Sequence, residues 1–559
     1  MEFSWIDYAV FILYGLVIIS IGLYVSRGKG QTSEDYFLAG KTLPWWAIGA
    51  SLIAANISAE QFIGMSGSGF AIGLAIASYE WMAALTLIIV GKFFLPIFIN
   101  KGLYTIPEFI EKRYSTNLKT ILAIFWIALF IFVNLTSVLY LGATALDTIM
   151  GAGDGGLFYY SIIGLALFAA AYSLYGGLSA VAWTDVIQVV LLVAGGLITT
   201  GFALHYLAEG DGIFAGIKMV YERVPEKFSM ILSKGEIITP DGRDAWWDLP
   251  GLAVIFGGMW VANLYYWGFN QYIIQRTLAA KSLAEAQKGI VLAAFLKIII
   301  PVIVVLPGII AFVMNSDAAG NVTAASADPS FFSFTGRIIN DNAAPWLITT
   351  FVPVGLKGLV LAALAAAIVS SVASMLNSTA TIFTMDIYKP FFAKKDGSEK
   401  NLVTVGRLSA SLALVIAVIL APQLQNLGQV FQYIQEYTGI VSPGILAVFM
   451  MGLFWKKTTN NAAIWGVLIS IPIAAYFKVG PNDWSDSAFF VVLPFMNQMM
   501  WTWILTMLVM VVISLIEGKG QDHDKGIPLT KSLFSTTPAF NISSIIILLL
   551  LTVLYGLFW

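Results

Sequence analysis

Long apolar segments recur along almost the whole chain, and no other feature of the sequence constrains the fold as strongly. Of the 559 residues, 58% are hydrophobic and only 11% are charged, whereas a soluble domain carries about 25% charged residues. A lipid bilayer removes the need for a polar surface that this composition could not provide. Because a span takes about 20 mostly apolar residues, we expect an all-α integral membrane protein with about fourteen transmembrane helices. They centre near residues 15, 56, 86, 132, 168, 192, 262, 300, 372, 412, 440, 468, 504 and 549.

Scarce or missing residue types exclude several classes of protein. The net charge is −2, so nucleic acid is not an expected partner. Cysteine is absent, which excludes disulfides and thiolate chemistry. The two histidines, His205 and His523, lie near loops, which argues against a zinc site and against an intramembrane enzyme. The first apolar segment, 6–24, lacks a basic leader and a small-residue cleavage site, so we interpret it as a retained span.

Basic residues mark alternate loops between the predicted spans. They occur in 26–44, 100–119, 275–289 and 389–401, and again near 456 and within 519–531, whereas the short loops 67–73, 148–157 and 422–428 have none. Loops rich in lysine and arginine stay in the cytoplasm, so we expect both termini outside the cytoplasm. The long segment 206–249 carries five basic residues, but long loops cross the membrane largely regardless of charge.

One predicted span, 49–64, is interrupted at mid-membrane by residues that a lipid-facing helix avoids. These residues are Asn56, Ser58, Glu60 and Gln61, and such groups are costly at this depth unless they face a cavity. The pattern is typical of a broken transporter helix whose unwound carbonyls line a binding site. A packing seam of small residues is the alternative.

The segment 260–271 repeats this interruption with Asn263, Gly268 and Gln271. It lies five spans after 49–64, and an odd offset means that the two segments cross the membrane in opposite directions. An inverted repeat of five plus five helices produces this relation. We therefore predict a transporter core built from two inverted halves.

Small and hydroxylated residues share one face of the predicted span near 372. Ala367, Ser370 and Ser371 are spaced i, i+3 and i+4 on a helix. Two hydroxyls and nearby carbonyls would form a neutral oxygen cage, which sodium accepts and which magnesium or calcium would supplement with carboxylates. A helix-packing seam is again the alternative.

Besides Glu60, the charged residues Glu80, Lys297 and Asp185 fall inside predicted spans. An unpaired charge at this depth is costly, so Glu80 and Lys297 are expected to face a polar cavity and to share a hydrogen-bonded ligand. For Lys297 the alternative is a side chain that snorkels to the membrane interface. Asp185 is either a way-station for a cation or an interfacial residue.

These features resemble the solute:sodium symporter family over nearly the whole chain. The most specific stretches are 54–69, 172–185, 263–277, 365–388 and 431–444; the second carries the Gly-Gly-Leu signature of the family, and the others point to its sugar-carrying branch. The resemblance implies a leucine-transporter-type 5+5 inverted-repeat core with flanking helices. We accordingly divide the chain into an extra N-terminal helix and cytoplasmic loop (1–44), a first repeat (45–206), an extracellular segment (207–249), a second, inverted repeat (250–455) and C-terminal accessory helices (456–559).

The resemblance also assigns residues to a binding site. It implies a sodium site at Ala54, Ile57, Ala367, Ser370 and Ser371. The side chains that would clasp a hexose are Gln61, Glu80, Asn263, Lys297 and Gln435, with Tyr266 beneath the ring. Met65, Tyr79 and Phe431 would form an outer lid, Tyr266 an inner gate, and Asp185 would help sodium to leave. The sequence departs from the sugar-binding relative at Ala83, which replaces a serine, and one lost hydroxyl shifts affinity or hexose preference by about 1 kcal/mol.

The function implied by the resemblance is symport of a hexose, galactose or glucose, with sodium into the cell by alternating access. The expected location is a bacterial inner membrane, the expected unit is a monomer, and no enzymatic chemistry is implied. A family member that carries proline, pantothenate or a carboxylate is the nearest alternative, although Glu80 disfavours an anionic substrate. A transporter-like membrane sensor is a further alternative, but the part after Trp501 offers only one loop and one helix.

Overall fold

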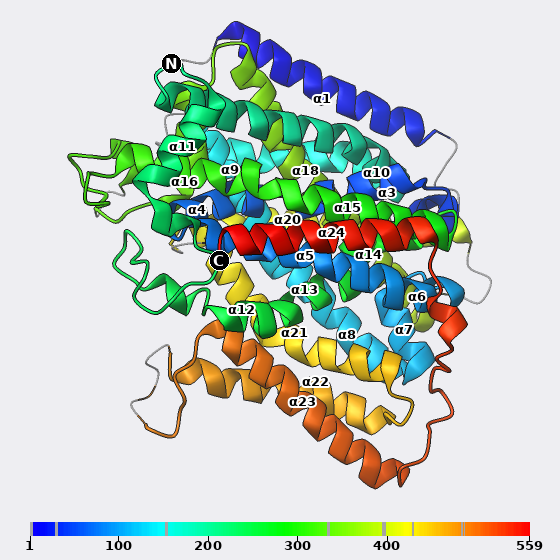
Figure 1. Cartoon of the computed structure of the whole chain (residues 1–559). Helices are drawn as coiled ribbons and strands as arrows, with labels where there is room; N and C mark the ends of the chain where they lie inside the picture. Colours follow the sequence, from blue (N-terminus) through cyan, green and yellow to red (C-terminus); the bar gives the residue numbers. More distant parts are fainter. Residues whose placement is uncertain are drawn as a thin grey trace.

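The computed structural model describes residues 4–27, 32–150, 155–332, 336–393, 398–426, 430–481, 485 and 487–559. Within these ranges the chain is almost entirely helical (Figure 1), and its β-pairing is confined to three isolated bridges. The side chains at 425, 426 and 430–433 lie outside the description. The predicted all-α class is confirmed for the described part of the chain.

Helices long and apolar enough to cross a bilayer form most of the bundle. Eleven occur among the described residues, or twelve when a pair bent by 76° is counted as one span. The eleven are α1 (Trp5–Val25), Leu74–Asn100 with α5 (Ser78–Ile89) and α6 (Leu95–Asn100), Thr116–Met150 with α8 (Thr116–Ala128) and α9 (Thr136–Met150), α10 (Phe158–Leu207), Leu283–Asn315 with α15 (Leu283–Val304) and α16 (Leu306–Asn315), Leu356–Phe391 with α18 (Leu356–Ile382) and α19 (Lys389–Phe391), Glu399–Leu424 with α20 (Glu399–Leu420), α21 (Val430–Phe454), α22 (Asn460–Val479), α23 (Phe495–Gly518) and α24 (Pro538–Leu557). The bent pair joins Ala245–Phe256, which ends in α12 (Leu252–Phe256), to α13 (Gly258–Phe269). Shorter helices are α2 (Ser33–Leu38), α7 (Ile106–Arg113), α11 (Ile213–Arg223) and α17 (Ala343–Phe351).

The predicted count of about fourteen spans is not confirmed, because some of the expected segments are not single straight helices. One of them is α10, whose 50 residues cover the expected spans near 168 and 192. At about 1.5 Å per residue, 50 residues correspond to some 75 Å of helix, more than twice the roughly 30 Å of membrane hydrocarbon, so α10 is long enough for both expected spans. Its backbone leaves the helical conformation at Gly177, with φ 57° and ψ −149°. An added Cβ there would lie 2.3 Å from the carbonyl oxygen of Tyr36, so this kink requires glycine.

Both mid-membrane interruptions predicted from the sequence are confirmed. Helix α3 (Trp45–Asn56) stops at Ile57, whose backbone is extended with φ −79° and ψ 93°. The chain resumes as a π-helix, η2 (Glu60–Met65), followed by α4 (Ser66–Ala71). Helix α13 stops before Asn270, with φ −83° and ψ 119°, and α14 (Gln271–Leu278) follows. Two broken helices therefore meet the interior of the bundle.

The broken helices are enclosed by the longest helices of the bundle. Helix α3 packs against α15 and α10, and α10 packs most extensively against α18. Helix α1 lies along α10 and α18 at one edge, while α22 and α23 pack on α21 at the opposite edge (Figure 1). The last helix, α24, lies against α5 and α15. The terminal helices thus flank a core that contains both breaks.

A carboxylate on the N-terminal helix bonds to the start of α18. Asp7 Oδ1 accepts hydrogen bonds from the backbone N–H groups of Gly355 and Gly358, both at 2.8 Å. These groups belong to the first turn of α18, where backbone N–H groups have no partner within the helix. A negative charge also stabilises the positive end of a helix dipole. Asp7 is therefore an N-terminal cap for α18 supplied by another helix.

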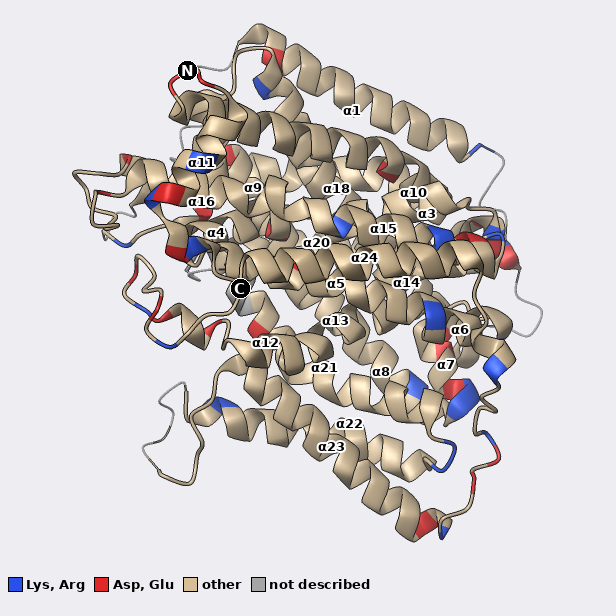
Figure 2. Ribbon diagram, in the orientation of Figure 1, with Lys and Arg blue, Asp and Glu red and all other residues tan. Residues whose placement is uncertain are grey.

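Charged side chains gather at the two ends of the bundle and are sparse along its middle (Figure 2). The two marked termini lie at the same end of the helices (Figure 1). This arrangement is consistent with a membrane that surrounds the middle of the bundle and with termini on one side of it. Which side that is stays a prediction from the basic loops.

The predicted extracellular segment 207–249 folds back on the second half of the first broken helix. The Nζ atom of Lys227 donates to the carbonyl oxygens of Phe70 and Ala71, both at 3.0 Å, and lies 3.9 Å from the ring centroid of Phe312. A cation at these carbonyls stabilises the C-terminal end of α4. Burial lowers the pKa of Lys227 to about 7.

Replacing Gly308 with alanine is expected to destabilise the fold, because α16 touches the broken helix at this glycine. An added Cβ would lie 1.9 Å from the carbonyl oxygen of Ser66, which is backbone and cannot move aside. Overpacking of this kind costs about 1–3 kcal/mol, so the purified variant should unfold at a lower temperature in detergent. Gly164→Ala is the control, since nothing lies within 4 Å of its added Cβ. Equal thermal stability of the two variants would contradict this packing.

Candidate functional site

A cavity lies in the bundle at the two helix breaks. It is lined by residues from η2, α5, α13, α15 and α21, among other elements. All six residues predicted to contact a hexose line it: Gln61, Glu80, Asn263, Tyr266, Lys297 and Gln435. Residues from distant parts of the sequence thus meet around one space.

A buried ion pair forms one wall of the cavity. The Nζ atom of Lys297 donates to Glu80 Oε2 and to Asn56 Oδ1, and it lies 5.1 Å from the ring centroid of Trp267. The side chains of Lys297 and Glu80 are 1% and 4% exposed. Lys297 therefore does not snorkel to an interface, and that alternative is wrong. Removing one partner of such a pair leaves an uncompensated buried charge.

A chain of hydrogen bonds connects the ion pair to the predicted inner gate. Asn56 Nδ2 donates to the hydroxyl of Tyr266 at 3.0 Å, and the hydroxyl of Tyr272 donates to the same oxygen at 2.8 Å. Asn56 was noticed in the sequence as a costly mid-span residue but was not assigned to the site. Its amide reaches both Lys297 and Tyr266, so a shift of either residue disturbs the other.

The amide side chains of the site are partly held by the protein itself. Gln61 Oε1 accepts hydrogen bonds from Ser58 N at 3.1 Å and from Ser58 Oγ at 3.0 Å. Asn263 Nδ2 donates to the carbonyl oxygen of Met259 at 3.2 Å. These bonds fix the orientation of the amides while they leave other atoms of each group for a ligand.

Other lining residues include two predicted lid residues and one residue that the sequence did not assign. Met65 and Tyr79 line the cavity, as does Ala83, whereas the side chain of Phe431 lies outside the described residues. Glu60 also lines the cavity and is 8% exposed, and its Oε1 atom has no hydrogen-bond partner among the described residues.

The predicted sodium ligands lie where α3 stops against α18. Ala54 and Ile57 flank the end of the helix, and the hydroxyl of Ser371 donates to the carbonyl oxygen of Ala55 at 3.1 Å. Ala367 is buried on the same helix as Ser371. A helix that stops leaves its last carbonyls without donors from its own backbone, so carbonyl and hydroxyl oxygens converge here. The five residues contain no charged side chain.

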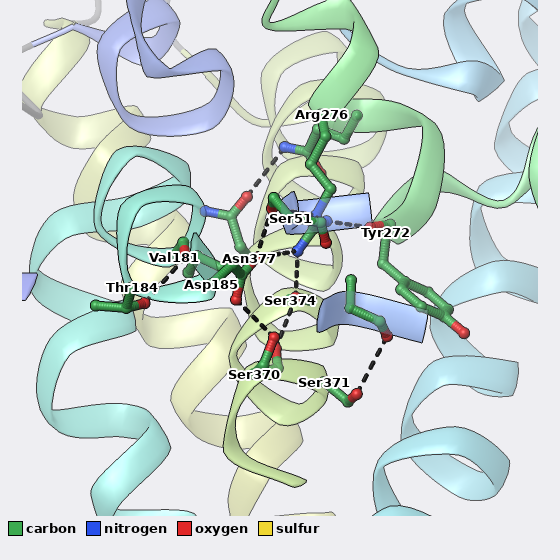
Figure 3. Close-up of polar contacts among 12 residues, drawn as sticks. Ser51, Val181, Thr184, Asp185, Tyr272, Arg276, Ser370, Ser371, Ser374 and Asn377 are labelled. Atoms are coloured by element: carbon green, nitrogen blue, oxygen red, sulfur yellow. Dashed lines mark hydrogen bonds and ion pairs between the residues drawn. The ribbon is translucent and has the colours of Figure 1, made fainter. Parts of the chain in front are cut away.

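Next to these oxygens lies a fully buried carboxylate, Asp185, surrounded by donors from three other helices (Figure 3). It accepts a hydrogen bond from Ser370 Oγ at 2.6 Å and one from Ser51 Oγ at 2.5 Å. An ion pair with Arg276 spans 3.5 Å. The interpretation of Asp185 as an interfacial residue is therefore wrong, because its side chain is 0% exposed.

The guanidinium of Arg276 organises this cluster. Its Nε atom donates to Ser51 Oγ at 2.9 Å, and its other nitrogens donate to Ser374 Oγ and to the carbonyl oxygen of Tyr272. We expected Arg276 to lie in the cytoplasmic loop 275–289, and that placement is wrong: the residue is fully buried on α14. The sequence did contain a signal for a helical position: Arg276 follows Tyr272 by four residues in a partly apolar stretch, which puts both on one face of a helix.

A bundle of membrane-spanning helices with two central breaks and a polar cavity at those breaks is typical of a secondary transporter. Comparison with known proteins narrows this class. Residues 36–470 match the model of the sodium:solute symporter family, and the chain belongs to that family.

The relatives agree with this assignment over most or all of the chain. The sodium/glucose cotransporter of Vibrio parahaemolyticus is 60% identical over 559 residues, which cover 100% of this chain and 98% of the relative. Sodium/glucose cotransporter 1 of Oryctolagus cuniculus is 34% identical, over 84% of this chain and 71% of the relative. A solved substrate-bound, outward-open structure of a Na+-coupled sialic acid symporter superposes with a TM-score of 0.75 at 23% identity and covers 92% of this chain and 98% of that one. The predicted fold class is confirmed by this likeness.

Proposed function

We propose that this symporter carries a hexose, galactose or glucose, into the cell together with sodium. The observation that carries the proposal is the pairing of Glu80 with Lys297 in a cavity that also presents amide groups and the ring of Tyr266. The names of the two sodium/glucose cotransporters support the same substrate class.

The chemistry of the cavity suits a neutral ligand with many hydroxyl groups. The carboxylate accepts hydrogen bonds, the ammonium donates them, and the amides of Gln61, Asn263 and Gln435 do both. Hydrogen bonds to charged groups contribute about 1.5–3 kcal/mol each. Because the two charges cancel, a neutral sugar can enter without leaving a net charge from this pair unbalanced.

Sodium would supply the energy for accumulation. One charge that moves down a potential of 100 mV releases about 2.3 kcal/mol, and a tenfold concentration gradient adds about 1.4 kcal/mol. Together, at one sodium per sugar, these support accumulation of several hundredfold. The ion would bind at Ala54, Ile57, Ala367, Ser370 and Ser371, and Asp185 would help it to leave.

In the proposed cycle, sodium enters first from outside and braces the end of α3 against α18. The cavity residues are then ordered for the sugar, the lid formed by Met65, Tyr79 and Phe431 closes, and the two inverted repeats rock. Movement of Tyr266 opens the inner path. The proposal includes the domain boundaries given above, a monomeric unit in a bacterial inner membrane, and both termini outside the cytoplasm.

Uptake of labelled galactose and glucose into proteoliposomes tests the proposed function. Uptake is expected to exceed equilibrium when an inward sodium gradient is imposed and to lose this excess when potassium replaces sodium. A competition panel of hexoses, proline and pantothenate tests the substrate class. Uptake that does not depend on sodium would exclude the coupling, and inhibition by proline or pantothenate but not by hexoses would exclude the sugar.

Gln435→Ala is expected to weaken sugar binding without changing the sodium requirement. The loss of one or two hydrogen bonds of about 1 kcal/mol each raises the half-saturating hexose concentration by about fivefold to thirtyfold. Initial rates over a range of hexose concentrations measure the shift. Gln521→Ala, an exposed loop residue, is the control. An unchanged half-saturating concentration would remove Gln435 from the site.

A further inference from the structure

Several polar side chains line the cavity beyond the residues assigned to sugar and sodium. Asn134, Asn270 and Ser442 are 7%, 2% and 0% exposed, and all three line the same cavity as Tyr266 and Gln435. Within the described residues, their side-chain oxygens have no hydrogen-bond partner. A buried polar group without a partner is costly, so these groups call for a ligand that the resting cavity does not provide.

Two of the three groups lie farther along their helices than the assigned sugar contacts on the same helices. Asn270 follows Tyr266 by four residues, at the break after α13. Ser442 follows Gln435 by seven residues on α21, which is two helical turns on the same face and about 10 Å along the axis. Asn134 comes from the π-helix η5 (Leu129–Leu135), which packs against α21.

The direction of this displacement is toward the basic loops. Helix α13 leads through α14 to Lys281 and Lys288, and α21 leads to Lys456 and Lys457. The positive residues place these loops in the cytoplasm. Asn270 and Ser442 therefore lie on the cytoplasmic side of Tyr266 and Gln435, and Asn134 lines the same cavity from η5.

We propose that Asn134, Asn270 and Ser442 form an exit subsite, a second binding position that takes up hydroxyl groups of the sugar after it passes Tyr266. The inference rests on the proposed hexose transport and deepens it. All three groups are neutral, and each carries both a donor and an acceptor, which matches the hydroxyl groups of a polyol. A sugar that leaves Glu80 and Lys297 would exchange charged partners for neutral ones, so it is held weakly enough to leave.

The subsite would lower the barrier to passage, because the sugar hydroxyls would keep hydrogen-bond partners as the sugar moves away from Glu80 and Lys297. A hydroxyl without a partner in a dehydrated passage loses the bonds that it had to the protein or to water. Each group of the subsite replaces one of them. Removal of one group should then slow passage while binding at the assigned site stays the same.

The test uses Ser442→Ala and Asn134→Leu in the full-length reconstituted protein. Labelled galactose is exchanged across proteoliposomes with equal sodium and equal sugar on both sides, so that return of the empty carrier does not limit the rate. Loss of one hydrogen bond of ordinary strength is expected to slow exchange by about fivefold, with an unchanged dissociation constant for galactose in detergent. Ser544→Ala is the control, a buried serine on α24 whose hydroxyl already bonds to Phe540 O at 2.8 Å.

Two further readouts separate the subsite from a structural role. The thermal stability of sugar-free Ser442→Ala should not fall, because the hydroxyl has no partner there to lose. A series of monodeoxygalactoses identifies the sugar hydroxyl that Ser442 binds. The analogue that lacks this hydroxyl should exchange at the same rate in wild type and in Ser442→Ala, because the interaction is absent from both.

Each of the remaining outcomes overturns a specific claim. If exchange by both variants matches wild type, the groups bind water only and the subsite is refuted. If the dissociation constant weakens in parallel with exchange, the residues belong to the assigned site and the exit position is refuted. If wild-type protein exchanges no hexose at all, the proposed function itself fails.

Discussion

Lys297→Met is expected to abolish hexose uptake. The substitution keeps much of the side-chain volume but removes the cation that bonds to Glu80 and Asn56. Breaking a buried pair costs about 3–5 kcal/mol, because the remaining charge has no partner. Glu80 would then take up a proton or a water molecule, and the site would lose its only donor of a charge-assisted bond among the six assigned residues. Sodium-driven uptake of labelled galactose is the measurement.

Two control variants distinguish the effect of an unbalanced buried charge from the effect of losing a lysine side chain. Lys112→Met removes the cation of an exposed pair with Glu108, whose side chains are 38% and 25% exposed, and such pairs contribute about 0–1 kcal/mol. It should leave uptake and stability unchanged. The double variant Lys297→Met/Glu80→Gln should recover thermal stability but not transport, since it removes both charges. Uptake that survives in Lys297→Met would refute the sugar assignment of this pair.

Ser371→Ala is expected to weaken the binding of the coupled sodium ion. Its hydroxyl lies against the end of α3 and donates to the carbonyl oxygen of Ala55, where it would also supply an oxygen ligand to the ion. Loss of one interaction of about 1.5–3 kcal/mol with a charged partner raises the sodium concentration for half-maximal uptake by about tenfold or more. Galactose uptake over a series of sodium concentrations at constant ionic strength gives this value.

The matched control for sodium is Thr379→Val. Thr379 is buried on the same helix, but its hydroxyl bonds to the backbone of that helix, at Met375 O. Its sodium dependence should equal that of wild type. An unchanged sodium dependence in Ser371→Ala would place the ion elsewhere.

The sequence predicted the breaks because their signal is local. A polar residue at mid-membrane is costly wherever its helix points, so Asn56 and Asn263 marked the two interrupted spans without knowledge of any neighbour. The number of spans was less accessible, since hydropathy does not show where two consecutive helices join without a loop, as they do at Gly177.

Pairings between distant residues were the part that the sequence could not determine. Glu80 and Lys297 were expected in one cavity, but the role of Asn56 as a bridge to Tyr266 depends on how three helices pack. Arg276 was placed in a loop because positive charges usually mark loops, yet in the structure its charge is matched by Asp185 in the interior. Such compensation is a property of the packed bundle and not of either segment.

The cap that Asp7 provides for α18 has a mechanical consequence for the transport cycle. Helix α18 carries Ser370 and Ser371 of the proposed sodium site, so a tilt of α18 that altered this site would also move its first turn. The two hydrogen bonds from that turn end on α1. Helix α1, which carries no assigned ligand, is thereby attached to α18, which carries proposed sodium ligands. In the proposed cycle, a movement of α18 therefore either carries α1 with it or breaks the two hydrogen bonds to Asp7.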